Sequence, residues 1–241
     1  MSLFVISDLH LSTDAGTNKS MEVFGNKWLH YTEKIKNNWT RLITEKDTVI
    51  IPGDISWALN IEESLPDLKW IDALPGKKIF LKGNHDFWWS TISKMRKILN
   101  DNQITSIEFL YNSALEVENY IIAGSRGWFV DKSIQSQKNI NADHEKILNR
   151  EVIRLKLSLD VAKKLALEHE DKEIIVFLHF PPIWGDFECS EILNLLKEYN
   201  VKRCFFGHIH GCYNQSATFL WEDIKFEMIS ADFIDFIPRI V

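Results

Sequence analysis

Short runs of β-branched and aromatic residues alternate along the chain with longer segments in which apolar residues recur at helical spacing. The short runs are typical of core strands, and the longer segments are typical of helices that cover a sheet. The pattern predicts core strands at Leu3–Ile6, Thr48–Ile51, Lys78–Leu81, Ile174–Leu178 and Arg203–Phe206. It predicts helices at Phe24–Ile43, Ile61–Leu74, Trp88–Leu99, Ala142–Glu168 and Ser190–Tyr199. The expected N-caps are Asn60, Ser90 or Thr91, Asn141 and Ser190.

Two segments depart from this alternation. Ser113–Gly124 has a turn signal near Glu118-Asn119, and Ala217–Ile229 has one near Glu222-Asp223, so both are expected to form antiparallel hairpins. Together the elements predict an α/β fold with mixed sheets. No repeat, low-complexity tract or long linker interrupts the 241 residues, and we therefore expect a single domain over 1–241.

Each predicted core strand leads directly into a short polar cluster. These clusters are Ser7-Asp8-Leu9-His10, Gly53-Asp54, Gly83-Asn84-His85-Asp86, His179-Phe180-Pro181-Pro182 and Gly207-His208-Ile209-His210-Gly211. In α/β sheets ligands bind in the crevice beyond the carboxyl ends of the strands, so these side chains are expected to lie close together.

The polar side chains in these clusters are typical of a metal centre. The candidate ligands are Asp8, His10, Asp54, Asn84, His179, His208 and His210. Carboxylate and imidazole together favour Mn, Fe or Zn, with Co and Ni also compatible. Seven candidates are too many for one tetrahedral ion, and they suit two ions that share a bridging carboxylate. Such a pair of ions can hold a phosphoryl group and a bridging hydroxide together.

The charge of the chain argues against a main role in gripping nucleic acid. There are 28 basic and 34 acidic residues, which gives a net charge of −6 with histidine neutral. A nucleic-acid backbone requires a surplus of Lys and Arg. Two divalent ions held by two aspartates would nevertheless leave a locally positive crevice, whose natural ligand is an anionic phosphoester.

His85 and Asp86 fall outside this set of ligands. An imidazole beside the metal site can protonate a leaving alkoxide or stabilise the transition state, and a neighbouring carboxylate can fix its tautomer. We therefore expect His85 to be the general acid and Asp86 to orient it.

The order Asp-x-His, Gly-Asp, Gly-Asn-His-Asp, His-x-Pro-Pro and Gly-His-x-His, over residues 8 to 211, resembles the calcineurin-like metallophosphoesterase superfamily. The resemblance implies a four-layer α/β/β/α sandwich with two mixed sheets and a dinuclear-metal phosphoester hydrolase. It implies that Asp8, His10 and His210 hold the first metal, that Asn84, His179 and His208 hold the second, and that Asp54 bridges them. It also gives His85 the acid or transition-state role.

Departures from the superfamily's patterns reduce the number of candidate substrate classes. Asp54 is followed by Ile55-Ser56-Trp57 and not by the Asp-Arg-Gly element of Ser/Thr protein phosphatases, and Asp86 stands where those enzymes have Glu. The net charge and the absence of a basic tract disfavour the nucleases, and His85 stands where related sugar-lipid pyrophosphatases tend to have Arg. A small phosphodiester, phosphomonoester or nucleotide remains. The alternatives are a noncatalytic metal-binding scaffold of the same fold, or a nuclease.

Three further residues are candidates for substrate contacts. Trp57 lies close to a metal motif, Trp128 follows a predicted hairpin strand, and Arg126 could hold a phosphate with two hydrogen bonds. Packing in the core explains each tryptophan better than a substrate contact does, and a surface or ion-pair role explains Arg126 equally well.

The three cysteines, Cys189, Cys204 and Cys212, are an odd number in a chain too long to depend on disulfides, which predicts a reduced, cytoplasmic compartment. Apolar runs such as Ile174–Leu178 are much shorter than the roughly 20 residues of a membrane-spanning helix. The expected partner is a small phosphorylated substrate and not a membrane or a nucleic acid, and the sequence leaves the oligomeric state open.

Overall fold

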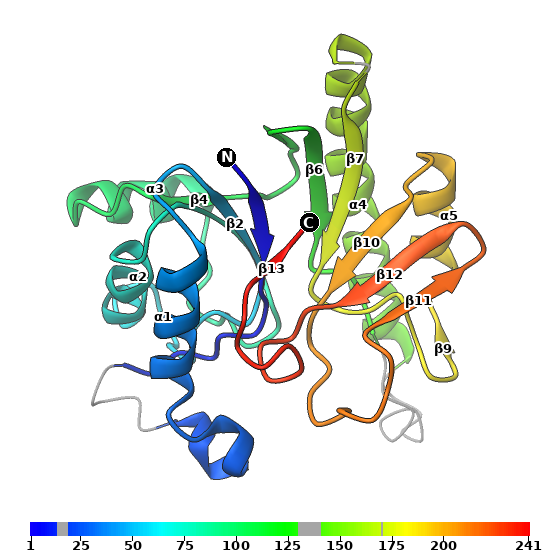
Figure 1. Cartoon of the computed structure of the whole chain (residues 1–241). Helices are drawn as coiled ribbons and strands as arrows, with labels where there is room; N and C mark the ends of the chain where they lie inside the picture. Colours follow the sequence, from blue (N-terminus) through cyan, green and yellow to red (C-terminus); the bar gives the residue numbers. More distant parts are fainter. Residues whose placement is uncertain (14–18, 130–140, 170) are drawn as a thin grey trace.

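A computed structural model shows two mixed β-sheets, with helices on their outer faces (Figure 1). It describes residues 1–13, 19–129, 141–169 and 171–241, with the side chains of 141–143 left aside. The four-layer α/β/β/α arrangement expected from the family resemblance is confirmed.

The first sheet has the strand order β13-β1-β2-β3-β4. Its strands are β1 (Leu3–Val5), β2 (Thr48–Pro52), β3 (Lys77–Leu81), β4 (Ile107–Phe109) and β13 (Arg239–Ile240). The strands from β1 to β4 are parallel, and β13 is antiparallel to β1. The carboxyl ends of β1, β2 and β3 therefore lie at one edge of this sheet.

The second sheet has the order β11-β12-β10-β7-β6-β5. Its strands are β5 (Leu115–Val117), β6 (Tyr120–Ser125), β7 (Glu173–Leu178), β10 (Arg203–Phe206), β11 (Thr218–Trp221) and β12 (Ile224–Met228). The inner strands are parallel, whereas β5–β6 and β11–β12 form the two antiparallel hairpins expected from the sequence. A small ribbon of β8 (Ile183–Trp184) and β9 (Phe187–Glu188) lies apart from both sheets.

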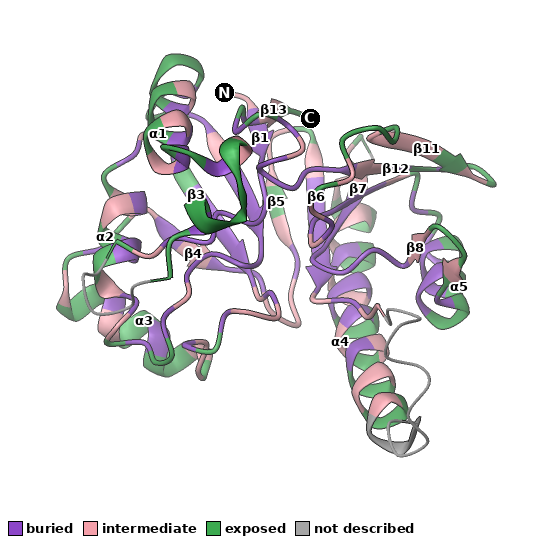
Figure 2. Ribbon diagram, turned by 90° about the horizontal axis from the view of Figure 1, so that it is seen from below, coloured by how far each residue is buried: buried purple, intermediate pink, exposed green. Residues whose placement is uncertain are grey.

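Three apolar clusters hold the layers together, and the buried residues follow the strands and the inner faces of the helices (Figure 2). One cluster lies between the first sheet and α1 (Tyr31–Leu42), α2 (Leu65–Asp72) and α3 (Ile92–Asp101). The second lies between the other sheet and α4 (Asn141–Glu168) and α5 (Ser190–Glu198). The third lies between the sheets, where Phe177 stacks on Phe205 at 5.2 Å. None of the helices in the described ranges is long and apolar enough to cross a membrane.

The helix expected over Phe24–Ile43 is broken into three pieces. Two short 3-10 helices, η1 (Met21–Phe24) and η2 (Asn26–Trp28), precede α1. The backbone turns at Gly25, with φ of 114°, and again at His30, with φ of 54°. Both values are incompatible with a continuous right-handed helix, so the N-terminal part of the expected helix forms a separate corner of the molecule.

The helix boundaries agree with the sequence in part. Thr91 caps α3 as expected, since its hydroxyl accepts a hydrogen bond from Lys94 N. The cap of α2 is Ser64 and not Asn60, because the chain forms a turn at Asn60 before the helix begins. The cap of α5 is Cys189, one residue before the expected Ser190. The side chain of Asn141, another expected cap, lies outside the described residues.

One buried lysine links the first sheet to the segment at the end of α2 through hydrogen bonds. Lys78 is fully buried on β3, and its ammonium donates hydrogen bonds to Asp72 O (3.2 Å), Leu74 O and Ser106 Oγ (3.0 Å). Asp72 is the last residue of α2 and Leu74 follows two residues later, at a helix end where backbone acceptors lack partners within the helix. Burial lowers the pKa of Lys78 to about 8.

We expect Lys78→Met to destabilise the fold by about 1–3 kcal/mol, because it leaves buried carbonyls without a donor. The matched control is Lys77→Met. Lys77 is the exposed neighbour, paired with Glu108 at 2.5 Å, and its loss should cost less than about 1 kcal/mol. Urea unfolding of the three proteins measures the difference, and equal stabilities would contradict this role of Lys78.

Candidate metal centre

The candidate site lies where the two sheets meet, beyond the carboxyl ends of β1, β2, β3, β7 and β10. The chain after β1 crosses between the sheets, because Ser7 pairs with Ser230 after β12 while Leu11 pairs with Ser56 after β2. Asp8 N and His10 N donate to Gly53 O and Asp54 O. The loop after β1 therefore positions ligands from both sheets around one point.

The backbone is bent unusually at four of the predicted ligands. Asp8, His10, Asp54 and His208 have φ values of 60°, 46°, 49° and 69°. Non-glycine residues rarely adopt this left-handed conformation, and they cluster at functional sites when they do. The chain thus turns sharply after β1, β2 and β10, at residues that supply donor atoms.

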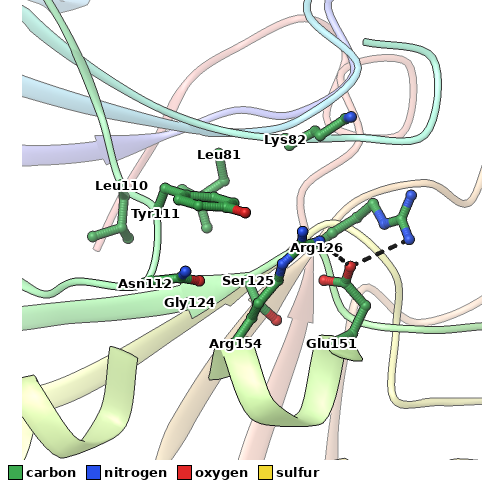
Figure 3. Close-up of a pocket in the computed structure, with 10 residues that line it drawn as sticks. All are labelled: Leu81, Lys82, Leu110, Tyr111, Asn112, Gly124, Ser125, Arg126, Glu151 and Arg154. Atoms are coloured by element: carbon green, nitrogen blue, oxygen red, sulfur yellow. Dashed lines mark hydrogen bonds and ion pairs between the residues drawn. The ribbon is translucent and has the colours of Figure 1, made fainter. Parts of the chain in front are cut away.

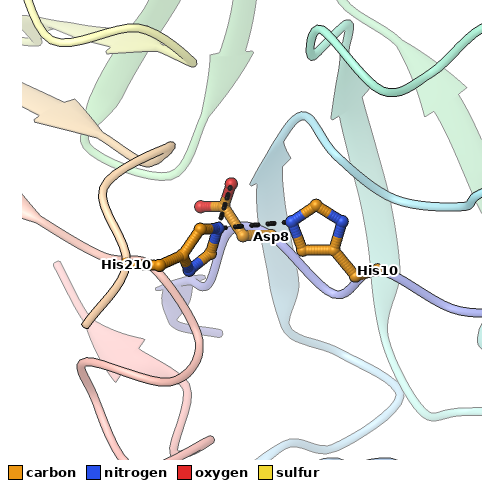
Figure 4. A group of neighbouring side chains, drawn as sticks. All are labelled: Asp8, His10 and His210. Carbon is orange, nitrogen blue, oxygen red and sulfur yellow. Dashed lines mark hydrogen bonds and ion pairs between the residues drawn. The ribbon is translucent and has the colours of Figure 1, made fainter. Parts of the chain in front are cut away.

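The first group of donors consists of Asp8, His10 and His210, which face one another in Figure 4. His210 Nε2 lies 3.3 Å from His10 Nε2 and 3.7 Å from Asp8 Oδ1. One donor atom from each of the three side chains lies within 4.8 Å of the others, a spacing that could hold a metal ion.

The second group consists of Asp54, His179 and His208, with the same mutual spacing. Asn84 joins it, since its Oδ1 lies 2.6 Å from His179 Nε2. Asp54 Oδ2 lies 3.5 Å from His179 Nε2 and 3.6 Å from His10 Nε2. One carboxylate oxygen is therefore close to donors of both groups, and all seven predicted ligands come together.

The electrostatics of these side chains fit a metal centre. Burial raises the pKa of Asp8 to about 6, and burial together with Asp8 and Asp86 raises that of Asp54 well above its usual value. Burial and neighbouring imidazoles lower the pKa values of His10 and His179, which keeps both rings neutral. Within the described chain, the charge partners of Asp8 and Asp54 are histidines. Buried carboxylates beside neutral imidazoles are the donors that transition-metal ions prefer.

Two glycines make room for the carboxylates. A Cβ on Gly83 would overlap Asp54 Oδ1, and a Cβ on Gly207 would overlap Asp8 Oδ2. Glycine is required at both positions because the backbone approaches an aspartate that any side chain would displace.

Asp86, the residue expected to orient His85, makes its hydrogen bonds with other groups in the structure. Its carboxylate accepts hydrogen bonds from the backbone N–H groups of Asp54, Ile55, Ser56 and Gly83 and from the indole of Trp88, at 2.8 to 3.3 Å. His85 Nδ1 is buried with no hydrogen-bond partner among the described residues. Asp86 instead ties the loop after β2 to the loop after β3, because a buried carboxylate needs several donors. His85 N donates to Asp54 Oδ1 at 2.8 Å, which places His85 beside both groups.

Asp232 is a residue of this site that the sequence analysis missed. It is fully buried, and its Oδ1 lies 2.8 Å from His210 Nδ1. Its Oδ2 accepts hydrogen bonds from Gly211 N (3.2 Å) and the Tyr213 hydroxyl (2.9 Å). Burial opposes a charge on His210, but the bond to Asp232 and the nearby Asp8 raise its pKa. The signal was present as Ser230-Ala231-Asp232, another polar cluster that follows a strand.

A cavity of about 350 Å³ opens over both groups of donors. Its lining residues are His10, Met21, Phe24, Trp28, Asp54, Trp57, His85, His208, His210, Gly211 and Tyr213. Trp57, a candidate for substrate contact, lies in its wall, with its ring 4.3 Å from that of His85.

The other two candidates for substrate contact lie outside this lining. Arg126 Nη2 pairs with the buried carboxylate of Glu151 at 3.3 Å, and Arg154 contacts the same oxygen at 2.6 Å (Figure 3). Trp128 packs on Phe180, with ring centroids 6.0 Å apart, and on the guanidinium of Arg126. Their role toward substrate stays a prediction.

The family model described as calcineurin-like phosphoesterase matches residues 1–212. The structure is similar to a phosphopantetheinyl hydrolase from Mycobacterium tuberculosis, with TM-score 0.54 and 15% identity over 100% of this chain and 95% of that one. It is also similar to TT1561 of Thermus thermophilus, with TM-score 0.55 and 12% identity over 96% of this chain and 89% of that one. At these identities the likeness concerns the fold alone. No curated protein sequence matches the chain.

We expect Asp232→Asn to weaken metal binding by about 10- to 100-fold, because a carboxylate bonded to a ligating imidazole fixes its tautomer and raises its basicity. Asp235→Asn is the matched control, since Asp235 is exposed and pairs with Lys27. Calorimetric titration of the metal-free proteins with Mn²⁺ gives the affinities. Unchanged affinity in the Asp232 variant would contradict the assignment.

Proposed function

Because the chain belongs to the calcineurin-like phosphoesterase family, we propose that it hydrolyses a small phosphoester at a centre of two divalent metal ions. The observation that carries this proposal is the position of Asp54, whose Oδ2 lies within 3.6 Å of ring nitrogens from both groups of donors. A carboxylate shared in this way suits two ions better than one.

The residues divide naturally between the two ions. Asp8, His10 and His210 would hold the first, Asn84, His179 and His208 would hold the second, and Asp54 would bridge them. Nitrogen and oxygen donors without thiolate favour Mn, Fe or Zn and are compatible with Co and Ni. When bound, such ions supply the Lewis acidity that polarises a phosphoester and activates water.

The protein around the ions binds and orients an anion. Two divalent ions exceed the charge of Asp8 and Asp54, so the crevice attracts phosphate although the chain as a whole carries −6. Asp86 holds the loops after β2 and β3 in place, and Gly83 and Gly207 leave room for the two aspartates. These features support a phosphorylated small molecule as the partner. The free Cys189, Cys204 and Cys212 support a reduced compartment, and we propose the cytoplasm.

His85 would act on the oxygen of the leaving group. Burial, with His210 and Lys19 nearby, lowers its pKa, so the free ring is neutral and still offers one N–H donor. The ring lines the cavity, and its backbone is fixed by Asp54. A donor at this position stabilises the charge that develops on a departing alkoxide.

Asp54→Asn should lower the metal content below two ions per chain and reduce turnover by at least about 100-fold, since it removes the shared charge. Asparagine is chosen because it tolerates the φ of 49° at this position better than alanine does. Asp47→Asn is the control, because the Asp47 carboxylate accepts hydrogen bonds from Thr44 and Ser2 and takes no part in the site. Full metal content with wild-type turnover in the Asp54 variant would rule out the dinuclear model.

His85→Asn should leave metal content unchanged and reduce turnover by roughly 100-fold on esters with alkoxide leaving groups. The loss should be much smaller on bis-p-nitrophenyl phosphate, because p-nitrophenolate departs without a proton. His30→Asn is the control, because His30 is absent from the lining of the cavity and its left-handed backbone tolerates asparagine. Equal losses on both kinds of ester would contradict a role at the leaving group.

A further inference from the structure

The cavity over the metal-ligand groups has two chemically different parts. Its floor consists of the polar residues His10, Asp54, His85, His208 and His210. Its walls are apolar and aromatic, and they are formed by Met21, Phe24, Trp28, Trp57 and Tyr213. Three of these wall residues come from η1 and η2, the corner created where the chain turns at Gly25. A phosphoryl group on the floor would therefore leave its organic substituent against the walls.

Two rings of the walls are exposed to solvent. Phe24 is 68% exposed and Tyr213 is 46% exposed, whereas Trp28 is buried and packs edge-on against His10 and His210. Trp57 is half-buried and stacks on His10 at 5.0 Å. A ligand that covers large apolar surface beside a concave site lowers the free energy of the complex, because it removes that surface from water.

The walls carry no positive charge for a second anionic group. Among the described lining residues there is neither Lys nor Arg. Two lysine ammonium groups outside this lining lie over ring faces, that of Lys19 over Trp57 at 5.5 Å and that of Lys27 over Tyr213 at 5.0 Å. Lys27 also pairs with Asp235. A second phosphate or a carboxylate in the cavity would lose its hydration and gain no buried cation in return.

We propose that the substrate carries one phosphoryl group and an uncharged apolar or aromatic organic group, which packs against Phe24, Trp57 and Tyr213. This inference rests on the phosphoesterase function proposed above. The cavity of about 350 Å³ lies within the range of small-molecule pockets, at roughly 300–1,000 Å³. Nucleoside diphosphates and triphosphates are disfavoured because their additional phosphates would lie between apolar walls.

Binding of aryl phosphonates to the Mn²⁺-loaded protein tests the proposal without turnover. Phosphonates place phosphorus at the metals and direct a single organic group into the cavity. We expect phenylphosphonate to bind about tenfold more tightly than methylphosphonate in calorimetry, because it buries a ring. We expect 4-carboxyphenylphosphonate to bind about tenfold more weakly than 4-methylphenylphosphonate, because its rigid para carboxylate points away from the metals and meets neither Lys nor Arg among the described lining residues.

Phe24→Ala should reduce the ratio of the affinities for phenylphosphonate and methylphosphonate roughly fivefold. Phe24→Leu should restore part of this ratio. Val23→Ala is the matched control: Val23 is the preceding residue of η1, 80% exposed, and absent from the lining of the cavity. Equal affinities for methyl- and phenylphosphonate would overturn the inference, as would tight binding of the carboxylate. If neither methylphosphonate nor inorganic phosphate binds, the phosphoesterase proposal itself fails.

Discussion

Two carboxylates, Asp8 and Asp54, are buried at the junction of the sheets with only imidazoles as charge partners in the described chain. An ionised carboxylate without a cation is costly in such a place, and the raised pKa values of both groups express that cost. His10 and His179 do not remove it, because burial keeps both rings neutral. His210, whose pKa is raised, offsets it only in part, since the pKa of Asp8 stays above its usual value. Bound metal ions would supply the missing positive charge, and the arrangement of the loops makes sense as a means of holding them.

The fold provides this arrangement through the way its sheets end. Parallel strands bring their carboxyl ends to one edge, and the crossing of the chain after β1 brings the edges of the two sheets together. Left-handed residues then turn donor atoms inward, and Gly83 and Gly207 let the backbone approach the aspartates. Asp86 stabilises the loop at Asp54 from behind, and Asp232 does the same for His210. Hydrogen bonds from Asp86 and Asp232 hold the floor of the site, whereas three of the five wall residues come from a separate corner of the chain. The floor would bind the metal ions, and the walls would select the organic group of the substrate.

The strand pattern and the polar residues after each strand were sufficient to predict five core strands, both hairpins and the group of seven donors. These predictions succeeded because strand periodicity is a local property of the sequence, and because parallel strands bring their carboxyl ends to one side of a sheet. The pattern did not predict β4, β13 or the β8–β9 ribbon, and the arrangement in two sheets came from the family resemblance. The role of Asp86 could not be predicted, because adjacency to His85 in sequence does not show that the carboxylate turns toward four backbone amides. Asp232 was missed because its strand was treated only as part of a hairpin. The break at Gly25 and His30, and with it the aromatic wall, depends on backbone angles that helical periodicity does not reveal.

The proposed centre requires that two ions bind at one shared carboxylate. Anomalous diffraction from crystals of the Mn²⁺-loaded protein tests it most directly. We expect two peaks, one in contact with Asp8, His10 and His210 and one with Asn84, His179 and His208, with Asp54 in contact with both. A single peak, or peaks away from these side chains, would contradict it.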